Sequence, residues 1–142
     1  MSIAQTLVGD GVDLIFANST PSAQAAKSAT SDIPIVFTSV TDAVGAELIA
    51  SMEAPGGNVT GTIDLHPDTI SNTAAFFKNE LGAKKVGTVY NTGEQNSIAQ
   101  VEQIKAALEA EGIELVEAAV SNSSEVKQAT ESLLGKVDSL YI

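Results

Sequence analysis

The sequence predicts an α/β fold in which parallel strands are flanked by helices. Three apolar, strand-like runs, which begin near Val12, Ile33 and Lys85, each end in a short polar loop that leads directly into a helix-like run. Strands that alternate with helices favour parallel sheets with right-handed crossovers. Open sheets of this kind bind ligands at the carboxyl ends of their strands, where helix N–H groups and short polar side chains meet. The three loops are therefore candidate binding sites.

Hydrophobic periodicity and stop signals predict the remaining elements in order. Strands are expected at residues 12–17, 33–40, 58–65, 85–90, 113–120 and from 139 onward, and helices at 3–8, 21–30, 44–52, 67–81, 97–111 and 124–136. The first two strands are continuous apolar runs, which is typical of strands that are covered on both faces. The segment Pro-Gly-Gly-Asn-Val-Thr-Gly, which starts at Pro55, is the best candidate for a boundary. We therefore expect residues 1–60 to be part of a first α/β lobe and residues 61–142 to be part of a second.

Composition excludes several classes of function. The chain has 142 residues and a net charge of −11 with only 7 Lys and Arg, which argues against nucleic acid as a partner. It has no cysteine and a single histidine, His66, so neither a disulfide nor a metal site is expected. There is no phosphate-binding glycine loop and no nucleophile–base motif. The sequence therefore predicts a binding protein for a small polar molecule, with no cofactor and no catalytic residue, rather than an enzyme.

Five segments carry a resemblance to a known family. They read DLIFANSTPSAQAA, DIPIVFTSVTDAVGAELI, PGGNVTGTIDL, KKVGTVYNTGEQNS and KVDSLYI. The chain resembles, from Ile3 to Ile142, the solute-binding proteins of ABC importers that bind aromatic amino acids such as tryptophan and tyrosine. Two positions depart from the family pattern, because Ala43 and Thr92 stand where the family usually has proline. Both changes loosen a turn without removing a polar contact.

The resemblance implies a type I periplasmic-binding-protein fold, in which two lobes hold the ligand between them. It also implies an ABC permease as partner and a location in the periplasm or on the extracellular face of the membrane. Family members are about twice as long, so we expect this chain to be a fragment with part of each lobe. Unpaired strand edges in such a fragment would favour self-association. The fragment should also be a poor binder of amino acids, because a ligand cleft needs both lobes.

Seven candidate ligand-binding residues fall in the first part of the chain. Ser19 and Thr20 either cap a helix or use hydroxyl and helix N–H groups to hold a ligand carboxylate. Asp42 either caps a helix or accepts a hydrogen bond from a ligand ammonium group. Asp64 lies on the crossover that, by the resemblance, faces the cleft. The remaining candidates are hydroxyl residues that follow the second strand, namely Thr38, Ser39 and Thr41.

Four further candidates lie in the polar loop after the strand at 85–90. They are Asn91, Glu94, Asn96 and Ser97. Asn91 could instead only form the turn, and Ser97 could only cap the following helix. Tyr90, at the end of the strand, either presents its ring to an aromatic ligand or is simply a core residue.

Two other functions remain open from the residues. The first is the effector-sensing domain of a LacI-type transcription regulator, which shares the fold. The second is a flavodoxin-like, nucleotide-binding enzyme domain.

Overall fold

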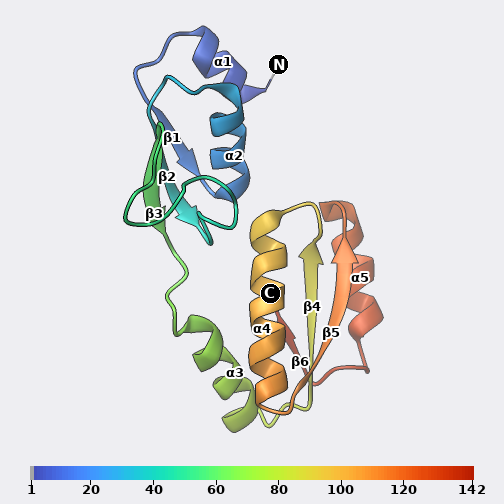
Figure 1. Cartoon of the computed structure of the whole chain (residues 1–142). Coiled ribbons are helices and arrows are strands. Elements are labelled where there is room, and N and C mark those ends of the chain that lie inside the picture. The colour runs from blue at the N-terminus through green and yellow to red at the C-terminus, as the bar shows by residue number, and fades with distance from the viewer. Residues whose placement is uncertain (1) are drawn as a thin grey trace. The chain divides into compact units, whose positions relative to one another are not determined.

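The computed structural model describes residues 2–142, which form two compact units that divide between Leu65 and His66. Each unit contains a three-stranded parallel sheet (Figure 1). The strand order is β1-β2-β3 in the first unit and β5-β4-β6 in the second. The predicted fold class, parallel sheets with flanking helices, is confirmed.

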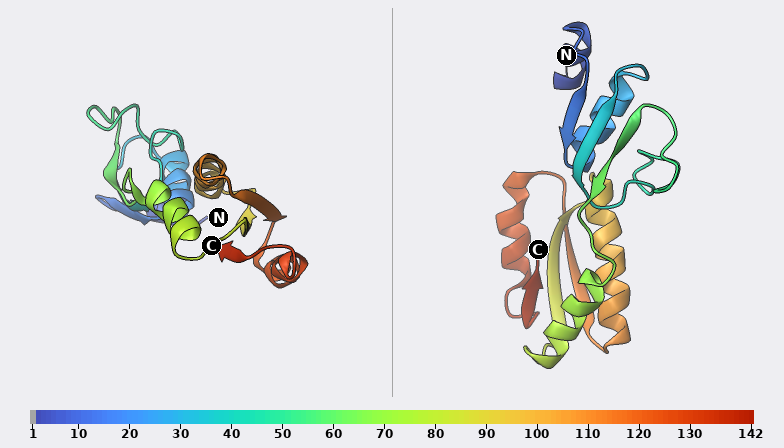
Figure 2. Two further views of the ribbon diagram at one scale, coloured as in Figure 1. Left: turned by 90° about the horizontal axis from the view of Figure 1, so that it is seen from below. Right: turned by 90° about the vertical axis from the view of Figure 1, so that its left-hand side faces the viewer.

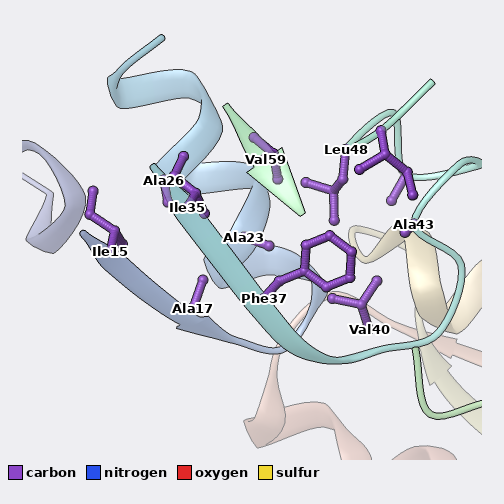
Figure 3. Close-up of a cluster of buried hydrophobic side chains, with 12 residues drawn as sticks. Ile15, Ala17, Ala23, Ala26, Ile35, Phe37, Val40, Ala43, Leu48 and Val59 are labelled. Carbon is purple, nitrogen blue, oxygen red and sulfur yellow. The ribbon is translucent and has the colours of Figure 1, made fainter. Parts of the chain in front are cut away.

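In the first unit, helix α2 (Thr20–Ala29) packs on one face of strands β1 (Ile15–Asn18) and β2 (Ile35–Val40). Helix α1 (Ile3–Gly9) packs against α2, and strand β3 (Val59–Ile63) completes the sheet. The core is aliphatic apart from Phe37. Figure 3 shows this ring beside Val40 and Leu48, with Ala23 of α2 nearby. Small alanine side chains allow α2 to lie close to the sheet.

The predicted helix at 44–52 is wrong. The chain from Thr41 to Asn58 consists of turns, bends and irregular stretches. Its buried apolar side chains, Ala43, Ala46, Leu48 and Ile49, cannot all lie on one face of a helix. The N–H groups of Leu48 and Ile49 both donate to the Ala43 carbonyl instead of forming regular helical bonds, and Glu47 has a φ of 57°. The crossover from β2 to β3 therefore has no helix, and the predicted strict alternation fails here.

The first strand is not covered on both faces as predicted. Ile15 and Ala17 are buried against α2, whereas Leu14 and Phe16 are 50% and 66% exposed. The reason is that α2 covers only one face of the sheet at this strand. An apolar run of this length cannot distinguish a strand with one covered face from a strand with two.

The second unit has helices on both faces of its sheet. Its elements are α3 (Thr69–Asn79), β4 (Lys85–Asn91), α4 (Gln95–Ala110), β5 (Glu114–Val120), a 3₁₀ turn at Ser123–Glu125, α5 (Val126–Leu133) and β6 (Ser139–Tyr141). Helices α4 and α5 lie on opposite faces of the sheet, and α3 packs beside α4 (Figures 1 and 2). On α4 the apolar side chains of Val101, Ile104 and Leu108 are buried.

Candidate functional site

The carboxyl ends of the three strands in the first unit bring several candidate residues to one edge of the sheet. The backbone N–H of Ser19 donates to the carbonyl of Thr38 at 3.0 Å, which places the end of β1 beside the end of β2. The N–H of Asp64 donates to the carbonyl of Val40 at 3.1 Å, which places the end of β3 next to β2. Parallel pairing of β1, β2 and β3 therefore gathers residues that are up to 45 positions apart (64 − 19).

Ser19 and Thr20 form the junction between β1 and α2. Ser19 is the residue before the helix, but its side chain makes no capping bond and its φ is 82°, an uncommon value for serine. Thr20 is only 2% exposed, and its Oγ1 atom has no hydrogen-bond partner among the described residues. Buried hydroxyls are normally hydrogen-bonded, so an unpaired one at a helix N-terminus is notable. The capping interpretation of these two side chains is not supported by the geometry.

The residues that follow the middle strand have different environments. Thr38 Oγ1 lies 3.4 Å from Thr62 Oγ1 on the neighbouring strand, Ser39 is exposed with a φ of 54°, and Thr41 is 9% exposed. Asp42 Oδ1 accepts a hydrogen bond of 2.8 Å from the N–H of Gly45. Asp42 therefore stabilises a turn, although not the N-terminus of a helix as expected.

Residues of the crossover segment lie at the surface. Asp64 is exposed, and its backbone is fixed to Val40 by the hydrogen bond described above. His66 is also exposed, and its Nδ1 accepts a bond of 3.3 Å from the N–H of Asp68. Among the described residues 2–142, no group of three or more His, Asp or Glu side chains could hold a metal ion.

In the second unit, the four candidates lie at the end of β4, in the loop that follows it and in the first turn of α4. Asn91 Oδ1 accepts from the N–H of Gly93 at 2.9 Å, and Asn91 Nδ2 donates to Glu94 Oε1 at 3.2 Å. Asn96 Oδ1 is buried and has no hydrogen-bond partner within the described chain. Ser97 lies inside α4, which begins at Gln95, so Ser97 does not cap the helix. The loop thus presents several oxygen acceptors at the carboxyl end of β4.

The hydroxyl of Tyr90 is held by Glu117, which is itself held by Lys105. The Tyr90 hydroxyl donates to Glu117 Oε2 at 3.0 Å, and Lys105 Nζ donates to Glu117 Oε1 at 2.9 Å. The hydrogen bond to the Glu117 carboxylate raises the pKa of Tyr90, and the Lys105 ammonium group lowers the pKa of Glu117. Tyr90 is half-buried, so it is neither a full core residue nor a freely rotating surface residue.

Sequence reasoning missed four residues near these loops. Thr62 pairs with Thr38, and alternation in the segment from Asn58 to Leu65 could have placed it on the face of β3 that faces Thr38. Gln100 follows Ser97 by three positions and shares its helix face, which is also a readable signal. Thr88 and Tyr141 are cross-strand partners on β4 and β6. No local pattern reveals their pairing, because it depends on how β6 aligns with β4.

Comparison with known proteins identifies the class. The fold is that of the type I periplasmic-binding proteins. The family model described as "ABC transporter substrate binding protein" matches residues 1–142, and the chain belongs to this family.

Three relatives define the similarity. The chain is 51% identical to the tyrosine-binding protein of Clostridioides difficile (strain R20291), over 99% of this chain and 41% of that protein. A conserved domain protein from Vibrio cholerae is 44% identical with a TM-score of 0.93, over 98% of this chain and 47% of that one. The ABC domain from Streptococcus pneumoniae in complex with L-Trp is 34% identical with a TM-score of 0.90, over 97% and 46%. The chain thus spans less than half the length of each of these relatives.

No helix within the described residues 2–142 has the length and apolar character that a membrane-spanning helix requires.

Proposed function

We propose that this chain is part of a solute-binding protein that reversibly holds an amino acid with an aromatic side chain. The family assignment and the two relatives named for tyrosine and L-Trp support this proposal. The single observation that carries it is the buried hydroxyl of Thr20 at the start of α2, which has no hydrogen-bond partner within residues 2–142. Binding of this kind makes and breaks no covalent bond, so we propose no catalytic role for any residue.

The start of α2 suits a carboxylate. The first N–H groups of a helix have no partner within the helix and carry partial positive charge. Ala23 N–H already donates to the Ser19 carbonyl, and Pro21 has no N–H, which leaves the N–H groups of Thr20 and Ser22 for a ligand. Together with the Thr20 hydroxyl they form a set of donors for the carboxylate of an amino acid. Thr38, Ser39 and Thr41 follow the adjacent strand, and we propose that these hydroxyls line the same site.

In the second unit, the loop after β4 suits an ammonium group. Glu94 carries a negative charge, Asn96 Oδ1 has no partner in the described chain, and both lie at the first turn of α4. A carboxylate and an amide oxygen are the acceptors that an ammonium group needs. We propose that Glu94, Asn96, Asn91 and Ser97 contribute to recognition of the amino end, and that Asp42 and Asp64 add negative charge in the first unit.

We propose that the two compact units, which divide between Leu65 and His66, are parts of the two lobes of a longer protein. Family membership further supports delivery of the ligand to an ABC permease and a location in the periplasm or on the extracellular face of the membrane. The same membership, over the whole chain, does not favour a LacI-type regulator or a flavodoxin-like enzyme domain.

We also propose that the 142-residue chain self-associates. Among the described residues 2–142, strand β1 pairs only with β2, so its outer edge offers backbone N–H and C=O groups to another strand. Phe16 and Leu14 add exposed apolar surface at this edge strand. The net charge of −11 opposes association through repulsion, which salt screens.

Substitution of Thr20 by valine tests the proposed function. Valine keeps the shape and removes a buried, unpaired oxygen, so thermal stability should not fall. Loss of a hydrogen bond to a charged carboxylate should weaken L-tryptophan binding by about 1.5–3 kcal/mol, as measured by NMR titration of the ¹⁵N-labelled chain. The matched control is Thr73→Val on α3, at a partly buried position outside the proposed site. Equal affinity of T20V, T73V and the wild type would refute the proposal.

A further inference from the structure

A cavity of about 230 Å³ lies within the second unit, at the carboxyl ends of β4 and β6 and beside the first turns of α4. The chain has only two tyrosines, and both of them, Tyr90 and Tyr141, line this one cavity. Its polar wall is formed by Ser97 and Gln100 of α4. Ligand sites in proteins combine apolar or aromatic walls with a few convergent polar groups, and this cavity has that composition.

The Tyr90 ring is a fixed part of the wall. Its hydroxyl is engaged by Glu117, which Lys105 holds in turn, so the ring is tied down at its polar end. A hydroxyl that already donates to a carboxylate is not the donor for a ligand. Tyr90 therefore offers its ring rather than its hydroxyl.

Tyr141 differs from Tyr90 in the hydrogen bonding of its hydroxyl group. It is half-buried beside Thr88, its cross-strand partner, and no hydrogen bond from its hydroxyl is found within residues 2–142. Burial raises the pKa of Tyr141, so the phenol remains protonated at neutral pH. Its hydroxyl can accept from an indole N–H or pair with a phenol, as can the amide of Gln100 on the opposite wall.

We infer that this cavity holds the aromatic ring of the ligand, with Tyr90 and Tyr141 as its ring contacts and with Glu117 and Lys105 as residues that position Tyr90. This inference rests on the proposed function and adds to it the part of the protein that selects an aromatic side chain. Contacts between aromatic rings favour an aromatic ligand over an aliphatic one of similar size.

The direct test uses 3-methylindole, which has the ring of tryptophan without its amino and carboxylate groups. Titrated into the ¹⁵N-labelled chain, it should give saturable shifts at amides of Thr88–Asn91, Ser97–Val101 and Tyr141. Shifts confined to other parts of the chain, or no saturable shift, would overturn the inference.

Three substitutions to leucine localise the effect. Tyr90→Leu and Tyr141→Leu should each weaken 3-methylindole binding roughly threefold to tenfold. Phe76→Leu makes a matched change on α3, outside the cavity, and should leave the affinity unchanged. Equal affinity of all three variants would contradict the inference, whereas spectra that retain native dispersion show that the variants are folded.

Glu117→Gln tests the positioning of Tyr90. The pKa of Tyr90, followed by its ultraviolet absorbance, should move down toward its ordinary value of 10.0, and 3-methylindole binding should weaken. A lowered pKa with unchanged binding would exclude the positioning role of Glu117.

Failure of this inference and failure of the proposed function give different results. Binding of 3-methylindole at the cavity without any binding of L-tryptophan at the start of α2 would support the inference and refute the amino-acid site. If instead T20V weakens the binding of L-tryptophan and Y141L leaves it unchanged, the proposed amino-acid site is supported and the inference about the cavity is refuted.

Discussion

Gly61 of β3 lies directly against Phe37 of β2. A Cβ atom built at Gly61 would come within 2.6 Å of the Phe37 ring and would also collide with the Phe37 carbonyl oxygen. The ring belongs to the buried core of the first unit, and the register between β2 and β3 shifts just beyond this pair. Glycine is therefore required at position 61 by a close approach of backbone and ring, not by its φ angle.

Gly61→Ala should destabilise the first unit by about 1–3 kcal/mol, because the Phe37 carbonyl and the packed Phe37 ring cannot shift without disturbing the sheet and the core. Urea denaturation measures this change. The control is Gly9→Ala at the end of α1, where an added Cβ meets nothing within 4 Å, so stability should be unchanged or slightly higher. If G61A and G9A were equally stable, the proposed packing of Phe37 against β3 would be wrong.

Asp138 should make stability depend on pH in the acidic range. Its Oδ2 accepts from the N–H groups of Lys84 and Lys85 at 2.7 and 2.9 Å, and these bonds hold its pKa below the ordinary value of 3.8. A lowered folded-state pKa gives stability that is complete above the ordinary value and is lost as pH falls through the lowered one. Denaturation at a series of pH values should show this loss.

Asp138→Asn removes the titrating group and should flatten that part of the pH profile. Asp13→Asn, at an exposed position, changes the net charge equally and serves as the control. An identical acid slope in D138N and D13N would show that the Asp138 bonds do not contribute to acid sensitivity.

Self-association should depend on Phe16. Sedimentation velocity of the wild-type chain should show a dimer or larger species that is favoured by salt, and Phe16→Glu should shift it toward monomer. Phe76→Glu adds the same charge at another exposed phenylalanine, 52% exposed on α3, and should have little effect. A wild-type chain that remains monomeric at all salt concentrations would disprove the association proposal.

Much of the fold was predictable because its signals are local. The stripe of Val101, Ile104 and Leu108 has helical spacing, and the run from Lys85 to Tyr90 has the composition of a strand; both elements are present in the structure. The polar loops after the strands were also predictable, because strand ends and helix starts favour the same small polar residues.

The segment from Thr41 to Asn58 was not predictable, because distant side chains determine its course. Gln24 Nε2 donates to the Ala46 carbonyl at 3.2 Å, and Lys27 Nζ donates to the carbonyl of Glu47. Asn58 Nδ2 donates to the Ile33 carbonyl at 2.8 Å. These contacts join residues that are 20 to 25 positions apart in the sequence. Tertiary contacts therefore override the helix-like local pattern of this segment.

The candidate site was likewise predictable only in part. Ser19 and Thr20 could be selected from the sequence, but the absence of a partner for the Thr20 hydroxyl within the described residues requires the structure. Tyr141 was missed because its place beside Thr88 depends on the alignment of β6 with β4.

The most direct test of the central proposal compares L-tryptophan with tryptamine, which lacks only the carboxylate, in NMR titrations of the ¹⁵N-labelled chain. If the start of α2 binds the carboxylate, L-tryptophan should shift the amides of Ser19, Thr20 and Ser22 in a saturable way, and tryptamine should leave them unchanged. Equal shifts by both compounds at these amides, or none by L-tryptophan, would contradict the proposal that this chain contributes an amino-acid binding site.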